Sequence, residues 1–360
     1  MKSYTLPKVP LELVILPEVD SNQIRNLSLY TNLSKHKSKI DEVRNKWDSA
    51  KKVSNEYEYI YTSSNSRKNI SQLIPVSRSF FKLREIIYDY RLNVGGTCAC
   101  IAEAPGGFVQ SILHHTSERK IELNTIHGIT LVSDDKDIPY WNPQLIQNPQ
   151  LNVCVGSDKT GDLYKLNNVL SFIKQCKKHS CQFVTADGGF DYTQDFEQEL
   201  ASYPLIYSEI MIALNVQAKG GTFVCKLFDL FYDSTIELLY LLYLSYETIT
   251  FCKPYTSRQS NSEKYILCRG FKGYNVIISN LLCSSFGHSK LPIEIPDEFI
   301  TMINHYQMLF VKNQCMRING TLDLISQRRI MDKPSKHQLK LAKDWCKNYN
   351  IPINHYHIYR

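Results

Sequence analysis

The chain has 360 residues, of which 43% are apolar and 21% charged, with a formal net charge of +7. This is the composition of a globular protein, and no run of about eighteen apolar residues suggests a transmembrane helix. Pro7, Pro10 and Pro17 interrupt the apolar patch near the N-terminus, which argues against a secretory signal and predicts an intracellular protein.

The net charge and the cysteines indicate what the protein is expected to bind. The positive charge favours a polyanionic partner, although many enzymes carry as much. The eleven cysteines are odd in number, often lie within apolar runs and lack paired C-x-x-C spacing. Buried thiols behave as small hydrophobic side chains, and a reducing compartment leaves them unpaired. We therefore expect free cysteines and no metal site.

The sequence pattern divides the chain into three parts. Residues 1–70 are polar without a clear strand pattern, which predicts an N-terminal extension that packs on the central part of the chain. Residues 71–270 alternate short apolar β-type runs with helical patterns, which predicts a doubly wound α/β sheet. Residues 271–360 predict a mostly helical, basic C-terminal extension.

Seven strands and four helices are predicted in the central part. The strands are Thr97–Glu103, Thr125–Leu131, Leu151–Val155, Gln182–Ala186, Thr222–Leu227, Thr248–Cys252 and Lys264–Arg269. The helices are Phe108–Thr116, Leu163–Lys177, Phe196–Gln217 and Ser234–Ser245. The last two strands follow each other closely, so the seventh can enter antiparallel, as a hairpin at the edge of the sheet.

A glycine turn follows the first predicted strand. The run from Cys98 to Phe108 passes from an apolar strand through Pro105, Gly106 and Gly107 into an apolar helix. Glycine lets the backbone turn sharply and a ligand approach closely, and ligands of such sheets bind at the carboxyl ends of strands. Glu103 would repel a pyrophosphate, so a ligand with a cationic centre fits better than NAD. A plain strand–helix turn is the alternative.

Four charged residues stand where a fold alone does not need them. Asp187 and Lys226 each end a predicted strand, Glu263 precedes the last strand, and Lys82 lies on a helix before the first. The fourth and fifth strands are expected beside the first, which would bring Asp187 and Lys226 to the glycine turn. Any one of them alone is more often a strand-end surface charge or an ion pair.

Lysines beside carboxylates suit methyl transfer to a ribose hydroxyl. A ribose 2′-hydroxyl is a poor nucleophile until it is deprotonated. A lysine flanked by another lysine and two carboxylates has its pKa tuned by neighbours and burial, and can orient the hydroxyl and steer its proton. Positioning supplies much of the catalysis of an in-line methyl transfer, and such a transfer requires no metal.

These four positions, in this order, resemble the Lys-Asp-Lys-Glu tetrad of the RrmJ/FtsJ-like ribose 2′-O-methyltransferases. The resemblance covers about residues 71–270. It is most specific in ADGGFDY, GGTFVCKLFDLF and LLYLSYETITFCKPYTSRQSNSEKYILCRGF, which are similar to the eukaryotic and viral mRNA cap branch. The resemblance implies a Rossmann-like sheet of seven strands with the last one antiparallel, and S-adenosylmethionine as cofactor.

The resemblance also implies roles for individual residues. Lys226 would activate the target hydroxyl, with Lys82 and Glu263 setting its protonation and Asp187 facing both the tetrad and the methyl donor. The cofactor-binding residues would be Ser77, Glu103, Ala104, Pro105, Gly106, Gly107, Phe108, Gly161, Asp162 and Asp187, with Asp162 favoured over Asp158. The residues that line the target RNA would be Arg78, Ser257, Arg258 and Asn261, with Lys253 as a further phosphate contact.

One position departs from the family pattern. Many members have an Asp five residues before the proline of the glycine turn, where this chain has Cys100. The acid here is Glu103, an arrangement that resembles some cap-enzyme relatives and favours those that act on the second nucleotide. This departure leaves open how the methionine end of the donor is held.

The expected activity is S-adenosylmethionine-dependent 2′-O-methylation of the first or second transcribed nucleotide of capped mRNA. One alternative is 2′-O-methylation of ribosomal or transfer RNA, and another is a catalytically silent RNA-binding or scaffold subunit of a capping complex. Expected partners are the capped RNA 5′ end and other capping or transcription subunits, with no membrane. The composition suits a large DNA virus or a unicellular eukaryote, which would place the protein in the cytoplasm or the nucleus, respectively.

Overall fold

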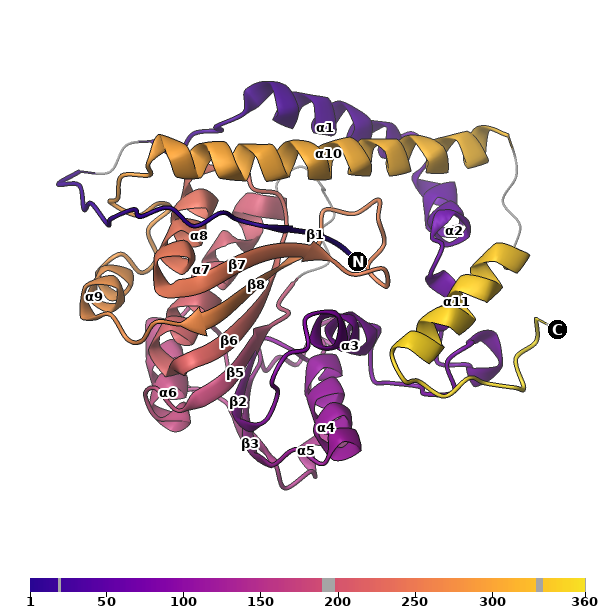
Figure 1. Ribbon diagram of the computed structural model, residues 1–360, viewed down its shortest axis with the longest axis horizontal. Helices are drawn as coiled ribbons and strands as arrows, with labels where there is room; N and C mark the ends of the chain where they lie inside the picture. The colour runs from indigo at the N-terminus through magenta and orange to yellow at the C-terminus, as the bar shows by residue number, and fades with distance from the viewer. Residues whose placement is uncertain (19–20, 190–197, 328–332, 360) are drawn as a thin grey trace.

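The computed structural model describes residues 1–18, 21–189, 198–327 and 333–359. Within these ranges a single mixed sheet runs through the centre of the molecule (Figure 1). Its strands lie in the order β1-β7-β8-β6-β5-β2-β3-β4. Their bounds are β1 Lys2–Thr5, β2 Gly96–Ile101, β3 Leu123–Ile129, β4 Leu151–Cys154, β5 Cys181–Ala186, β6 Gln217–Leu227, β7 Tyr246–Lys253 and β8 Lys264–Phe271.

Helices cover both faces of the sheet. In Figure 1, α6, α7 and α8 lie on one side and α3, α4 and α5 on the other. The bounds of these helices are α3 Ser79–Asp89, α4 Gly107–Arg119, α5 Pro143–Ile146, α6 Leu166–Cys176, α7 Gln198–Val216 and α8 Asp233–Ser245. The four predicted helices are confirmed to within three residues at each end, except that the expected start of α7, Phe196, lies outside the described residues.

Local sequence explains these elements. In α6, Val169, Phe172, Ile173 and Cys176 recur on one face of the helix and are buried, as the period of an amphipathic helix requires. Strand β5 is buried at every position except Gln182, because helices pack against each side of a parallel strand. Ten of the eleven cysteines are buried and all are free thiols, which agrees with their place in apolar runs.

The α/β class and the antiparallel last strand are confirmed, but three details of the predicted sheet are wrong. The sheet has eight strands, because β1 pairs antiparallel with β7 and forms the edge. Strand β8 is not at the edge: it is inserted between β6 and β7 and is antiparallel to both. Strand β5 separates β6 from β2, so β5 is the direct neighbour of β2 on this side.

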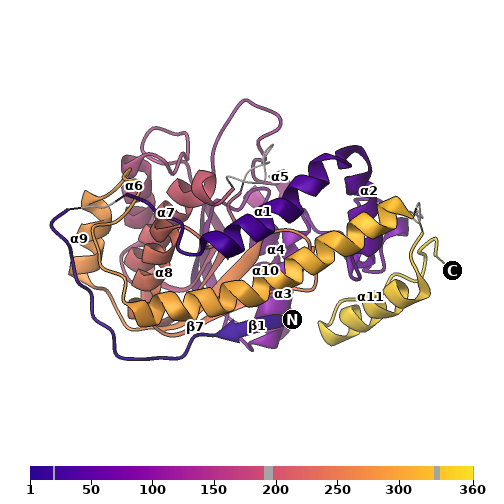
Figure 2. The same ribbon diagram turned by 90° about the horizontal axis from the view of Figure 1, so that it is seen from above.

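The two extensions pack together over one end of the sheet. The helix α10 crosses the molecule with α1 beside it, in both views (Figures 1 and 2). The bounds are α1 Leu27–Asp41, α2 Arg44–Ser54, η1 Glu58–Ile60, η2 Ser66–Lys68, α9 Val276–Ser284, α10 Asp297–Ser326 and α11 Lys336–Asn348. Contacts join α2 to α10 and α11 to η1, so residues far apart in sequence form a common layer.

The described ranges contain neither a helix suited to span a membrane nor a cluster suited to hold a metal ion. None of the helices there has the length and apolar character that a membrane span needs. Nor does the described part of the chain group three His, Cys, Asp or Glu side chains as ligands for a metal ion.

Candidate active site

A cavity of about 830 Å³ lies at the carboxyl ends of β2, β5 and β6. The structure therefore brings together residues that are up to 186 positions apart in the sequence, from Ser77 to Glu263. The predicted site residues that line it are Ser77, Arg78, Lys82, Ala104, Pro105, Gly161, Asp162, Asp187, Lys226, Asn261 and Glu263. Those that do not line it are Glu103, Gly106, Gly107, Phe108, Ser257 and Arg258.

Lys226 and Asp187 form one half of a charged cluster in this cavity. Asp187 directly follows β5, and Lys226 is the last residue but one of β6. The Lys226 Nζ lies 3.4 Å from Asp187 Oδ1 and donates a hydrogen bond to the Asp187 backbone oxygen at 2.7 Å. The hydroxyl of Tyr265, which faces Lys226 in the β6–β8 register, donates to Asp187 Oδ1 at 2.8 Å. The sheet thus holds the pair in place.

Lys82 and Glu263 form the other half. The Lys82 Nζ, on α3, is 2.8 Å from Glu263 Oε2, and Ser257 donates to Glu263 Oε1 at 2.7 Å. The side chains of Lys82, Glu263, Lys226 and Asp187 are only 10–14% exposed. Their charges are therefore weakly screened and act strongly on one another.

These charges decide the protonation of the cluster. Burial alone would lower the pKa of Lys226, but the carboxyl groups of Asp187, Glu263 and Glu209 outweigh it and the pKa is raised. Burial would likewise raise the pKa of Glu263, but Lys82, Lys226 and Lys253 hold it far below its ordinary value. The cluster consequently contains a charged Lys226 ammonium beside an ionised Glu263 at neutral pH.

Two of the residues expected to contact RNA, Arg78 and Arg258, are held by a buried acid. Glu58, fully buried in the N-terminal extension, accepts hydrogen bonds from Arg258 Nε at 3.1 Å and Nη2 at 2.8 Å. Arg78 lies 3.4 Å from the same carboxylate and donates to the Thr256 backbone oxygen at 3.0 Å. Both guanidinium groups thus hold the loop after β7, and phosphate binding by either remains a prediction.

Lys253 does not reach the surface. Its side chain is buried and donates to the backbone oxygens of Asn261 and Glu263. Burial lowers the pKa of Lys253 well below its ordinary value. The expectation that it contacts a phosphate is therefore wrong; it supports the loop that carries Glu263.

Glu209 is a residue of the site that the sequence analysis missed. It lies on α7, is 1% exposed, and accepts a hydrogen bond from the Gly188 backbone NH at 3.2 Å. It stands alone as an acid in the apolar run IYSEIMIAL, which was the available signal. Burial raises its pKa to about 8, partly offset by Lys226.

Glu209 is expected to make stability depend on pH. Between pH 4.5, the ordinary pKa of the group, and about pH 8, the folded protein keeps the Glu209 proton, whereas the unfolded chain has released it. The free energy of unfolding therefore decreases as the pH rises through that window. Glu209→Gln removes this pH dependence. Urea denaturation at about pH 5.5 and 8.5 should therefore show the variant gaining stability relative to the parent at the higher pH. A difference that does not change with pH would contradict this.

Comparisons with known proteins agree with this geometry. Residues 75–271, more than half of the chain, match the model of the FtsJ-like methyltransferases. The chain belongs to the FtsJ-like methyltransferase family. Relatives named cap-specific mRNA (nucleoside-2′-O-)-methyltransferase 1 include one from Dictyostelium discoideum, 31% identical over 276 residues, which covers 69% of this chain and 35% of the relative. Another, from Trypanosoma brucei brucei, is 34% identical over 175 residues, 48% of this chain and 46% of the relative.

A human relative with the same name is 38% identical over 122 residues, which is 32% of this chain and 15% of the relative. The chain thus spans less than half the length of these three curated relatives. The family match stops near the end of β8, so α9, α10, α11 and most of the N-terminal extension lie outside it.

The cofactor of this FtsJ-like methyltransferase is S-adenosylmethionine, and the cavity fits it. Gly161 approaches the Thr130 backbone so closely that a Cβ there would lie 1.9 Å from the Thr130 oxygen. Gly161, Asp162 and Tyr164 line the cavity, whereas Asp158 does not. Lys165 lies 2.8 Å from the Asp158 carboxylate and 3.8 Å from that of Asp162. This arrangement supports Asp162 as the acid for the adenosine moiety.

The glycine turn sets how closely α4 packs against the start of α3, which lines the cavity. A Cβ on Gly107 would lie 2.0 Å from Ser79 Oγ and 2.3 Å from Ser77 Oγ, so only glycine allows α4 to approach the start of α3. Phe108 packs in the core. Glu103 is 3% exposed, accepts from Thr185, and burial raises its pKa well above the ordinary value. It is therefore a buried acid rather than an exposed carboxylate.

Replacing Gly161 by alanine is expected to weaken S-adenosylmethionine binding at least about tenfold, because φ is +60° there and the added methyl meets backbone rather than a mobile side chain. Isothermal titration calorimetry measures this directly. Gly220→Ala is the matched control, since φ is +80° and a Cβ there has no atom within 4 Å. Equal affinities for both variants would show that the Gly161 loop does not hold the cofactor.

Proposed function

We propose that the protein methylates the ribose 2′-oxygen of the first or second transcribed nucleotide of capped mRNA. One observation carries the proposal: Lys82, Asp187, Lys226 and Glu263 converge in one cavity, where they form two ion pairs. The names of the relatives support capped mRNA as the substrate.

The chemistry of the cluster suits a hydroxyl nucleophile. Lys226, held as an ammonium by its neighbouring carboxyl groups, orients the 2′-hydroxyl and stabilises the negative charge that grows on its oxygen. Glu263 stays ionised, pairs with Lys82 at 2.8 Å and helps to raise the pKa of Lys226. S-adenosylmethionine, when bound, supplies the methyl group as a sulfonium electrophile. Because Lys226 is already charged, it does not take up the proton of the 2′-hydroxyl, which passes to solvent as the oxygen–carbon bond forms and the sulfur–carbon bond breaks. The chain itself contributes positioning and electrostatic stabilisation of the reacting oxygen.

The test uses purified protein, methyl-labelled S-adenosylmethionine and four short RNAs. These are uncapped, guanosine-capped, 7-methylguanosine-capped, and capped with the first ribose already methylated. Nuclease digestion then locates the label, with Lys226→Met as the inactive reference. Label on the first or second ribose of capped RNA alone supports the proposal and identifies the nucleotide.

Two other outcomes would replace the proposal. Equal labelling of uncapped RNA would indicate an enzyme for ribosomal or transfer RNA. Binding of S-adenosylmethionine without labelling of any RNA would indicate a silent scaffold or RNA-binding subunit.

A further inference from the structure

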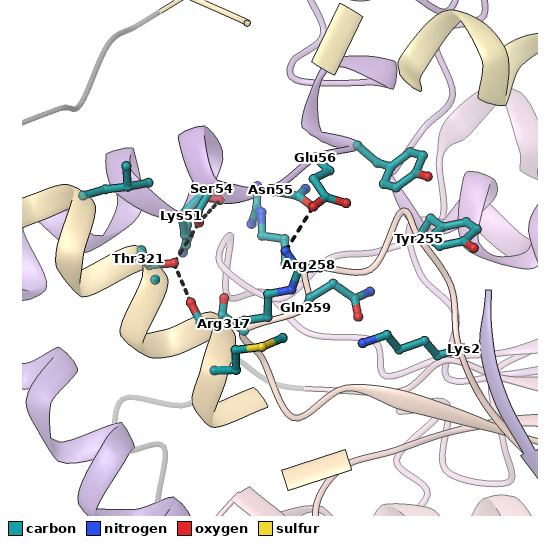
Figure 3. Close-up of a pocket in the computed structure, with 15 residues that line it drawn as sticks. Lys2, Lys51, Ser54, Asn55, Glu56, Tyr255, Arg258, Gln259, Arg317 and Thr321 are labelled. Atoms are coloured by element: carbon teal, nitrogen blue, oxygen red, sulfur yellow. Dashed lines mark hydrogen bonds and ion pairs between the residues drawn. The ribbon is translucent and has the colours of Figure 1, made fainter. Parts of the chain in front are cut away.

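A second cavity, of about 380 Å³, lies against the loop between β7 and β8 (Figure 3). Its wall combines the N-terminal extension with α10 and the start of β1, all of which lie outside the family match. The cationic and aromatic residues of its wall are Lys2, Lys51, Tyr57, Tyr255, Arg258 and Arg317. None of these was predicted to bind the cofactor, and of them only Arg258 was predicted to touch RNA.

The charge of this cavity favours an anion. Four cationic side chains line it against one acid, Glu56. Arg317 pairs with Glu56 at 3.1 Å, Arg258 pairs with Glu58, and Lys51 pairs with Asp48, whose side chain is 75% exposed. The Lys2 ammonium instead donates to the neutral side chain of Asn313, and its pKa is lowered by burial and by Arg317. An anionic group near Lys2 would therefore relieve repulsion between cations that already face each other.

The same cavity presents an aromatic surface. The rings of Tyr57 and Tyr255 are stacked, with centroids 4.7 Å apart and planes 24° from parallel. Both side chains are half-buried, and burial raises the pKa of Tyr57 to about 12, so its phenol is neutral. Stacked neutral aromatic rings beside cations are the combination with which proteins hold single-stranded nucleic acid: the rings stack on bases and the cations meet phosphates.

One loop forms a wall of both cavities. Tyr255, Arg258 and Ser260 line the second cavity, whereas Asn261 and Glu263 line the first. Arg78, which lines the first cavity, donates to the Thr256 backbone oxygen at 3.0 Å. The loop thus places the second cavity next to the first, where the ribose of an RNA at Lys226 would lie.

We propose that the second cavity binds a nucleotide of the RNA substrate other than the methylated one, with its base against the Tyr57–Tyr255 pair and its phosphate near Lys2 and Lys51. This inference rests on the proposed function. The nucleotide is either the cap guanosine or a transcribed nucleotide further along the chain, since both offer a base and phosphates.

The test compares Tyr57→Leu/Lys51→Gln with the parent on two probes, a capped dinucleotide and a capped ten-nucleotide RNA. We expect KM to rise about tenfold, the loss of one stacked base, with kcat little changed. A rise on both probes identifies the cap guanosine, and a rise confined to the longer RNA identifies a downstream nucleotide. Tyr57→Phe, which keeps the ring, should recover most of the affinity.

Lys46→Gln is the matched control, because Lys46 lies exposed on the same helix and lines neither cavity. Thermal denaturation of each variant reports whether it is folded. Unchanged KM on both probes in a folded double variant would overturn the inference. If the parent methylates no RNA, binding of the same ten-nucleotide RNA is measured by fluorescence anisotropy. Weaker binding by the double variant alone would support the inference that the second cavity holds a nucleotide. Equal binding by all variants would overturn it.

Discussion

Replacing Lys226 by methionine is expected to slow methyl transfer by about a thousandfold or more while S-adenosylmethionine still binds. The substitution keeps the length of the side chain but removes the cation that faces the reacting oxygen. Groups that assist proton movement or stabilise charge in the transition state typically contribute factors of about 10² to 10⁴. Single-turnover rates with methyl-labelled cofactor, at saturating capped RNA, measure the loss directly.

Two comparisons make this result interpretable. Lys226→Arg keeps the charge, but its planar fork does not match the site of a compact ammonium, so we expect only slight recovery. Lys174→Met changes an exposed lysine of α6 and should leave the rate unaltered. Retention of more than about a tenth of the parental rate by Lys226→Met, given the expected factor, would show that Lys226 does not act on the hydroxyl.

The site was largely predictable because its chemistry lies at strand ends. Asp187 and Lys226 each terminate an apolar run, and parallel strands bring their carboxyl ends to one edge of a sheet. Local sequence therefore indicated which residues would meet. The direction of the Lys226 pKa shift was less accessible, because it is the balance of burial against Asp187, Glu263 and Glu209, and Glu209 reaches the site from α7.

The rest of the structure depends on contacts between distant segments. Strand β1 has four residues, too few for a visible alternation. It is defined by its pairing with β7, in which Lys2 lies opposite Lys253, 251 positions away. Glu58 looks like an ordinary surface acid in sequence. Its burial is compensated by Arg78 and Arg258, which are 20 and 200 positions away. No local pattern encodes such partners.

The N-terminal extension is also tied to the active site by buried charge. Lys37 of α1 lies 2.8 Å from Asp229, and the two side chains are 7% and 10% exposed. Asp229 follows Lys226 closely in sequence and also accepts from Ser262, the neighbour of Glu263, at 3.0 Å. Burial would raise the pKa of Asp229, but Lys37 and Lys264 outweigh it and lower the pKa. One carboxylate therefore compensates two buried lysines next to the cluster that contains Lys226 and Glu263.

Replacing Asp229 by asparagine is expected to lower the free energy of unfolding by about 3–5 kcal/mol, because the change leaves buried cations without their counter-charge. Urea denaturation measures the difference. Asp41→Asn is the matched control: Asp41 lies on the same helix as Lys37 and pairs with Arg44, also at 2.8 Å, but the side chains are 49% and 57% exposed. Exposed pairs of this kind contribute little to stability, so this variant should denature with the parent.

The pH dependence identifies the cause of the loss. Burial lowers the pKa of Lys264 to about 8, even with Asp229 and Glu199 raising it, and without Asp229 it falls further. At a pH between this lowered pKa and about 8, Lys264 has released its proton in the folded variant but keeps it in the folded parent. The free energy of unfolding of the variant therefore rises with pH relative to that of the parent. The deficit should therefore shrink as the pH approaches 8. A loss of stability that does not change with pH would indicate lost packing. The N-terminal extension would then be held against the Lys226 cluster by packing rather than by the charge of Asp229.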